Sequence, residues 1–183
     1  MIHTQSTQKD IEAAMQCLRR RHHASPNKTQ LSAAYGFCLE NKMIESNETA
    51  RCYIKAKEMR GLSGVIVISV ITSPYPEYID ENGKTKTQRF SCKHDCHYCP
   101  REVDKEGREV NARSYLSDEP TVARGLRYKY DAIGQYNDRA RQYHRNGHYV
   151  DKIEIIVLGG TWTEYPRQYQ ETYIRDIFYA ANT

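Results

Sequence analysis

The chain has 183 residues, of which 39% are hydrophobic, and a formal net charge of +4. This length allows one modest core with an appendage, and the composition is typical of a globular protein. The sequence contains no secretory hydrophobic region and no apolar run long enough to cross a bilayer, so we expect a cytoplasmic protein without a membrane association. In that reducing compartment the six cysteines are not expected to form disulfides.

The positive charge is concentrated in the first third of the chain. Residues 1–60 hold ten Lys and Arg against six Asp and Glu, whereas residues 61–183 hold seventeen of each. Apolar periodicity predicts helices over about 9–21, 30–40 and 48–58. The first of these ends in Arg19, Arg20 and Arg21, which are suited to phosphate contacts but would also be favoured there by the helix dipole alone. We therefore expect a small helical unit that binds a polyanion, with a solvated helix end as the alternative.

The remainder, residues 61–183, alternates between strand and helix patterns. Residues 65–71 are almost all β-branched and do not alternate, which predicts a strand buried on both faces of a parallel sheet, and residues 152–158 predict a second such strand. A turn-rich loop over 73–88 follows the first strand. Further helices are expected from Pro120 to about Tyr128, with a side-chain cap from 117–119, from Asp131 to about Arg145, and from Pro166 onward.

This order indicates an α/β fold: a helical amino-terminal unit, 1–60, followed by the first β/α units of a partial β/α barrel, 61–183. A full barrel takes about 250 residues, so roughly 120 residues supply only two units. Two parallel strands alone would leave their edges bare. The apolar stripe of the last helix is predicted to contain Ile174, Ile177 and Phe178.

Three cysteines form the most informative feature of the sequence. Cys92, Cys96 and Cys99 have the spacing C-x3-C-x2-C, while the other three, Cys17, Cys38 and Cys52, are scattered and predicted to be small buried residues. A 4Fe–4S cluster held by three thiolates keeps one iron open for a non-protein ligand. A structural zinc site completed by His94 or His97 is the alternative, although zinc usually draws ligand pairs from two separate loops.

A glycine pair follows the second predicted strand. Gly159 and Gly160 would let the backbone approach a ligand closely at the carboxyl end of that strand, where parallel sheets place their ligands. The loop that begins after the first strand delivers the cysteines to the same end of the sheet. The two features together predict a cofactor site.

These motifs resemble those of the radical S-adenosylmethionine enzymes, and most closely the family of the catalytic subunit of Elongator. The resemblance runs from about Thr29 to the last residue and is most specific from Gly61 onward. It rests on C-K-H-D-C-H-Y-C-P at 92–100, S-Y-L-S-D-E-P at 114–120, G-H-Y-V-D-K at 147–152 and L-G-G-T-W at 158–162.

The resemblance implies a set of roles. Cys92, Cys96 and Cys99 would hold a 4Fe–4S cluster, the open iron would bind S-adenosylmethionine, and Gly159 and Gly160 would bind its methionine amino group. Thr161 stands where the family usually has an acidic residue. Lys152 would contact acetyl-CoA, or alternatively would cover apolar surface at a strand edge with its stem.

The implied reaction is the 5-carboxymethyluridine-type modification of the tRNA wobble uridine. In the family, a 5′-deoxyadenosyl radical takes hydrogen from the acetyl methyl group of acetyl-CoA, and the carbon radical adds to C5 of the uridine. The helical basic region, here with Arg19, Arg20 and Arg21, would bind the tRNA. The later barrel strands and the acetyltransferase-like domain of the family have no counterpart in the sequence.

Three hypotheses follow. The chain is an enzyme that works with a second chain supplying the rest of the barrel and the acetyltransferase-like domain, or an inactive tRNA-binding or complex-binding remnant, or a zinc-stabilised structural domain.

Overall fold

The structure is a computed structural model, and it describes residues 7–57 and 59–183. The chain divides into two compact units. The first comprises Met1–Ile66 and Ala140–Ile153, and the second Val67–Arg139 and Glu154–Thr183. Within the described residues, no helix combines the length and the apolar character needed to cross a membrane. The predicted division by function, at residue 61, stays a prediction.

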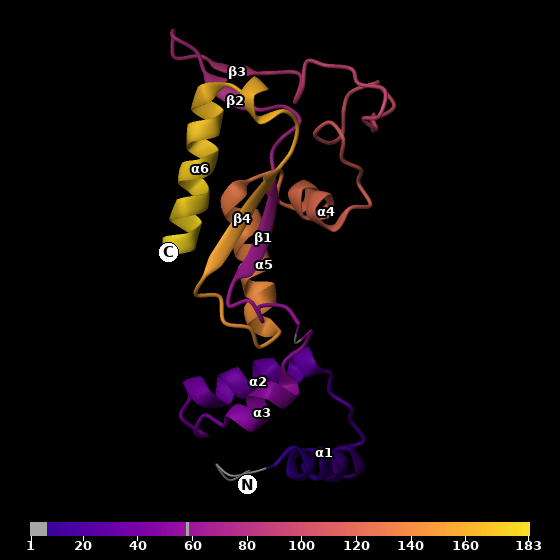
Figure 1. Cartoon of the computed structure of the whole chain (residues 1–183), viewed down its shortest axis with the longest axis vertical. Helices are drawn as coiled ribbons and strands as arrows, with labels where there is room; N and C mark the ends of the chain where they lie inside the picture. Colours follow the sequence, from indigo (N-terminus) through magenta and orange to yellow (C-terminus); the bar gives the residue numbers. More distant parts are fainter. Residues whose placement is uncertain (1–6, 58) are drawn as a thin grey trace. The chain divides into compact units, whose positions relative to one another are not determined.

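Three helices form most of the first unit: α1 (Gln8–His22), α2 (Lys28–Glu40) and α3 (Glu48–Ile54) (Figure 1). All three predicted helices are confirmed, although α3 ends at Ile54, four residues early. Each begins at a side-chain cap, since Thr7, Asn27 and Asn47 accept a hydrogen bond from the backbone N–H three residues later. The helices pack around a small apolar cluster made of Ile11, Met15 and Ala50, with Leu31, Tyr35 and Tyr53 against it.

The prediction that the scattered cysteines are buried is wrong for two of them. Cys17 and Cys52 are exposed, and Cys38 is half-buried. Cys17 lies six residues after the buried Ile11, which at 3.6 residues per turn places it on the far side of α1. With a core this small, only one side of each helix is covered.

The central sheet of the second unit pairs β1 (Ile66–Ile71) with β4 (Ile153–Leu158). The pairing is parallel, because the N–H groups of Ile66 and Thr72 donate to the carbonyls of Lys152 and Leu158, both 86 positions further along. Figure 1 shows the two strands side by side. The prediction for β1 is nearly confirmed, since Val67 alone among its residues is exposed.

The prediction that β4 is buried on both faces is wrong. Burial alternates along the strand, and the side chain of Ile156 is 41% exposed. Among the described residues, β4 has a neighbouring strand on one side only. Too few elements therefore pack against β4 to cover all of its apolar side chains.

The outer edge of β1, predicted to be bare, is instead covered by side chains. Gln135, which is completely buried, accepts a hydrogen bond from the Ile71 N–H and donates to the Ile71 carbonyl, each at 2.9 Å. The Tyr173 hydroxyl also donates to this carbonyl, at 2.8 Å, and the Arg124 guanidinium donates to the Ser69 carbonyl at 2.6 Å. These bonds satisfy the groups that a neighbouring strand would otherwise use.

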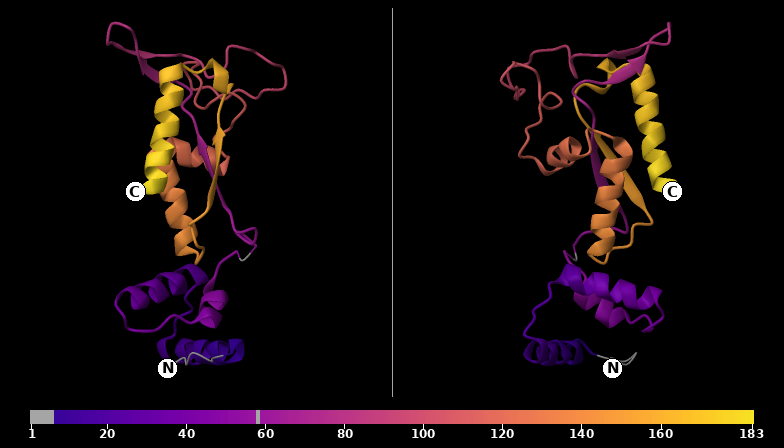
Figure 2. Two further views of the ribbon diagram at one scale, coloured as in Figure 1. Left: turned by 60° about the vertical axis from the view of Figure 1, so that its left-hand side comes forward. Right: turned by 180° about the vertical axis from the view of Figure 1, so that it is seen from behind.

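The segment predicted as a turn-rich loop contains a β-hairpin. Strands β2 (Glu77–Ile79) and β3 (Thr85–Thr87) pair antiparallel around a turn closed by the Asp80 side chain. Figure 2 shows the hairpin beside the first turns of α6, against which β2 packs. Three residues per strand are too few for a clear alternating pattern, so the sequence showed only the turn.

Three helices complete the chain: α4 (Pro120–Arg127), α5 (Ala132–Arg145) and α6 (Arg167–Asn182). Asp131 caps α5 as predicted, accepting from the Gly134 N–H at 2.6 Å. The predicted side-chain cap of α4 is wrong, because the Glu119 carboxylate accepts from the Leu116 N–H outside the helix. The other part of that prediction is confirmed: Pro120 lies in the first turn of α4, where a residue needs no N–H partner.

The predicted apolar stripe of α6 is only partly correct. Ile177 is buried, but Phe178 is 66% exposed and Ile174 lies at the surface. The buried face is completed by Tyr173 and Ala180.

Candidate functional site

The cysteine loop, residues 91–100, contains no helix or strand. It follows the β2–β3 hairpin and precedes a charged loop, residues 101–113. The thiols of Cys92, Cys96 and Cys99 are free and half-buried. Among the described residues, the one backbone–backbone hydrogen bond within the loop joins the Cys99 N–H to the Cys96 carbonyl at 3.0 Å. The loop is therefore held in place mainly by its neighbours.

The first neighbour is the glycine turn, Gly159 and Gly160, directly after β4. A Cβ on Gly160 would overlap the Ser91 carbonyl, and one on Gly159, whose φ is +149°, would overlap the Thr72 hydroxyl. Only glycine lets the two backbones approach this closely. The structure thus brings the turn after β4 against the residue that precedes Cys92.

Two side chains extend this contact. The Thr161 hydroxyl lies 3.1 Å from the Cys92 sulfur, and the Lys93 ammonium pairs with the Glu164 carboxylate at 3.0 Å. The hydrogen bond from Thr161 is the main cause that lowers the pKa of the Cys92 thiol, because it favours the thiolate. Thiolate is the form in which cysteine binds metals.

The other two cysteines have weaker partners. The Ser114 hydroxyl lies 3.6 Å from the Cys99 sulfur. The ring of Tyr98 is exposed, and a hydrogen bond with Cys96 raises the pKa of its phenol. All three thiols therefore lie near a hydroxyl group, from Thr161, Tyr98 or Ser114.

The three free thiols are donors of the kind that hold an iron–sulfur cluster, since cysteine thiolates are the ligands of such clusters. Among residues 7–57 and 59–183, no group of three or more His, Cys, Asp or Glu side chains lies together as a single-ion metal site would require. The assignment of the three cysteines as ligands stays a prediction.

A row of tyrosines supports the carboxyl end of the parallel sheet. These tyrosines were not predicted as part of the site. Tyr165, Tyr169 and Tyr173 stack with ring centroids 5.5 and 5.6 Å apart. Their hydroxyls contact three consecutive residues at the carboxyl end of β1: Tyr173 bonds the Ile71 carbonyl, Tyr165 the Thr72 hydroxyl and Tyr169 the Ser73 N–H. The four-residue spacing of these tyrosines was the available signal.

Burial raises the pKa of all three tyrosines above the ordinary value, so their hydroxyls stay protonated. Tyr165 also accepts a hydrogen bond from the Gly160 N–H at 2.9 Å. The same ring therefore fixes the end of β1 and the glycine turn after β4.

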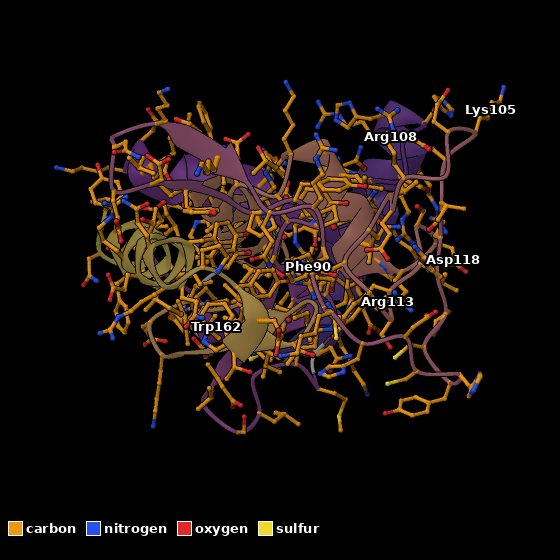
Figure 3. All side chains as sticks on the ribbon, turned by 90° about the horizontal axis from the view of Figure 1, so that it is seen from above. Phe90, Lys105, Arg108, Arg113, Asp118 and Trp162 are labelled. Atoms are coloured by element: carbon orange, nitrogen blue, oxygen red, sulfur yellow. The ribbon has the colours of Figure 1, made fainter. Side chains whose placement is uncertain are left out.

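Two cavities adjoin the site. One, of about 520 Å³, is lined by the glycine turn together with Tyr115, Trp162 and Tyr165. The other, of about 860 Å³, is lined by Cys92 and by basic and aromatic side chains: Tyr75, Arg89, Phe90, Lys93, Arg101, Arg108 and Arg113. Figure 3 labels three of these: Phe90, which directly precedes the cysteine loop, and Arg108 and Arg113 of the charged loop.

The remaining predicted site residues belong to the first unit. Arg19, Arg20 and Arg21 are exposed in the last turn of α1. Lys152 is exposed just before β4, and its carbonyl accepts the hydrogen bond from Ile66. Contacts of these four side chains with tRNA or acetyl-CoA stay predictions.

Comparison with known proteins finds relatives that share one name, Elongator complex protein 3. No family model matches the chain. Elongator complex protein 3 of Danio rerio and of Homo sapiens are each 31% identical to it over 159 residues, which is 82% of this chain and 27% of the relative. The Saccharomyces cerevisiae protein of the same name is 34% identical over 122 residues, 66% of this chain and 20% of the relative. The chain thus spans about a quarter of the length of these relatives.

Proposed function

We propose, from the premise that the chain is a homologue of part of Elongator complex protein 3, that it carries the cofactor-binding portion of a tRNA-modifying radical S-adenosylmethionine protein. The observation that carries the proposal is the contact between the cysteine loop and the glycine turn. Ser91 lies against Gly160, and Cys92 lies 3.1 Å from Thr161. Two motifs separated by more than sixty residues thus meet at the end of one small parallel sheet, where such sheets bind ligands.

Each motif has a part in this proposal. Cys92, Cys96 and Cys99 would hold a 4Fe–4S cluster as thiolates, and the backbone at Gly159 and Gly160 would receive S-adenosylmethionine. When bound, the cluster and S-adenosylmethionine would supply a carbon-centred radical. Thr161 favours the thiolate at Cys92 through its hydroxyl. Tyr165 holds the Gly160 N–H in position.

The substrates are proposed on the resemblance and the homology together. The product would be a 5-carboxymethyluridine-type wobble base, with the acetyl group of acetyl-CoA as the carbon source. Lys152 would contact acetyl-CoA, and Arg19, Arg20 and Arg21 would contact tRNA phosphates. The family's complete reaction also uses the rest of the barrel and the acetyltransferase-like domain. A cytoplasmic location belongs to the same proposal.

Anaerobic reconstitution with iron and sulfide tests the proposal. The purified chain should gain about four iron per chain, visible absorbance, and the ability to cleave S-adenosylmethionine when reduced. Cys96→Ala should lose the absorbance and the cleavage, because one cluster ligand is gone. Cys52→Ala, at an exposed cysteine in the first unit, is the matched control and should behave like the parent.

Two outcomes would contradict the proposal. If Cys96→Ala bound as much iron as the parent, the cysteine loop would not be the cluster site. If the parent bound one zinc ion tightly and no iron, the zinc-stabilised structural domain would replace it.

A further inference from the structure

Arg113 is attached to the cysteine loop at two places. Its backbone N–H donates to the Ser91 hydroxyl at 2.8 Å, and its guanidinium Nη2 donates to the Asp95 carboxylate. Ser91 and Asp95 directly precede Cys92 and Cys96. One residue outside the loop thus holds the two positions from which the first two thiols extend.

The Arg113 side chain is buried, so its charge depends on the carboxylates that pair with it. Its side chain is only 8% exposed, whereas that of Asp95 is 80% exposed, so the arginine bears most of the desolvation cost. Among the described residues, its Nε has no hydrogen-bond partner. A buried guanidinium is costly unless charged partners compensate for it, and Asp95 is one of only two carboxylates that do so.

The second carboxylate is Glu109, which accepts from Arg113 Nη1 at 3.3 Å and from Arg101 Nε at 3.2 Å. Glu109 therefore keeps one cationic partner if Arg113 is replaced. Among the described residues, Arg113 is the one ion-pair partner of Asp95. Loss of the arginine side chain should therefore release Asp95 and the middle of the cysteine loop. The charged loop that carries Glu109 should be less affected.

We propose that Arg113 is a positioning residue that orders the cysteine loop before any metal binds. The loop has almost no backbone hydrogen bonds of its own, so its conformational freedom must be restricted from outside. Thr161 and Lys93 hold the loop near Cys92, and Arg113 holds it at Ser91 and at Asp95. A site ordered in advance spares the metal the entropy cost of arranging its ligands. The use of the loop as a cluster site rests on the function proposed above, but its ordering does not.

The first measurement uses the metal-free protein. In Arg113→Met, amide hydrogen exchange within residues 91–99, at the Cys99 N–H that donates to the Cys96 carbonyl, should become at least about tenfold faster, because an anchor of the loop is lost. Arg113→Lys should restore part of the protection, since an ammonium can pair with Asp95 but lacks the planar fork that serves both carboxylates. Arg108→Gln is the matched control, because the described bonds of Arg108, to Asp104 and Glu106, all lie within the charged loop.

Asp95→Asn keeps the test decisive if Arg113→Met does not fold. Its side chain is exposed, so the substitution removes the pairing charge without opening a cavity. It should also speed exchange over residues 91–99. Unchanged exchange in this variant and in whichever Arg113 variant folds would overturn the proposal.

The second measurement uses the reconstituted protein. Arg113→Met should take up iron at least about tenfold more slowly than the parent and give a broadened electron paramagnetic resonance signal after reduction, and Arg113→Lys should recover part of both. If the parent takes up no iron while the exchange result holds, the proposed function fails and the positioning role stands. If iron uptake and the signal are normal in Arg113→Met, the role in preparing the site is refuted.

Discussion

The Tyr165 hydroxyl accepts a hydrogen bond from the Gly160 N–H at 2.9 Å and shares a second one, at 2.7 Å, with the Thr72 hydroxyl. A single buried side chain therefore joins the ends of the two strands of the parallel sheet. Thr72 is completely buried and Tyr165 is 3% exposed, so the Thr72 hydroxyl cannot easily replace a lost bond with one to water.

Tyr165→Phe should lower the free energy of unfolding by about 1–3 kcal/mol, because it removes the partner of the buried Thr72 hydroxyl and of the half-buried Gly160 N–H. Denaturant titration of the purified variant measures this. Tyr179→Phe is the matched control, since that ring is 59% exposed, and it should change stability by less than about 0.5 kcal/mol. Equal effects of the two substitutions would contradict the role given to the Tyr165 hydroxyl.

Gly160→Ala should destabilise the second unit by about 1–3 kcal/mol, because the new methyl group overlaps a backbone carbonyl that cannot rotate away. Thermal or denaturant unfolding measures the loss. Gly36→Ala in α2 has open space around the added methyl group and should be neutral or stabilising by up to about 1 kcal/mol. A Gly160→Ala protein as stable as the parent would show that the cysteine loop is free to move away from the glycine turn.

His148 gives the first unit a pH-dependent stability. The side chain is 3% exposed and donates to the Ala56 carbonyl at 2.8 Å through Nε2, and burial lowers its pKa. The unfolded chain then binds a proton more readily than the folded one. Neutral His148 contributes fully to the free energy of unfolding above its ordinary pKa near 6.5. This contribution is lost as the pH falls from 6.5 through the lowered pKa of His148 in the folded protein.

Unfolding measured between pH 7.5 and 5.0 should therefore show falling stability that is weaker in His148→Gln. His22→Gln, at an exposed histidine of α1, is the control and should keep the slope of the parent. The account fails if His148→Gln has an unchanged slope.

Reversal of Arg19, Arg20 and Arg21 to glutamate should weaken tRNA binding without regard to sequence and make the affinity less dependent on salt. Each phosphate contact contributes about −0.9 to the slope of log affinity against log salt on duplex, and about −0.7 on single strands. Filter binding or fluorescence anisotropy at several salt concentrations measures both quantities. Reversal of Lys105, which extends outward at the tip of the charged loop (Figure 3), is the control. Unchanged affinity and slope in the triple variant would reduce these arginines to a solvated helix end.

Much of the fold follows from local patterns in the sequence. The caps at Asn27, Asn47 and Asp131 and the β-branched run of β1 specify elements through interactions within a few residues, and these elements were predicted to within a few positions. Apart from the side-chain cap of α4, the predictions that failed concern burial. Whether Cys17 or Phe178 is covered depends on which other elements pack beside it, and periodicity carries no information about that.

The same distinction between local patterns and long-range contacts applies to the candidate site. Cysteine spacing and the glycine pair are visible in the sequence because they are contiguous. The supporting residues, Arg113, Tyr165 and Gln135, act on partners 18 to 93 positions away. An arginine at the end of a charged loop, or a tyrosine near the start of a helix, can contact many different partners. Only the folded structure identifies the partner of each.

Gln135 also determines where a larger sheet could extend. Its amide occupies both backbone groups of Ile71, so a strand approaching from that side would first have to displace it. Among the described residues, no side chain hydrogen-bonds to the outer edge of β4. Further strands can therefore join beside β4 but not beside β1. Any complete assembly built on this sheet should form an open arc with β1 at one end, not a ring.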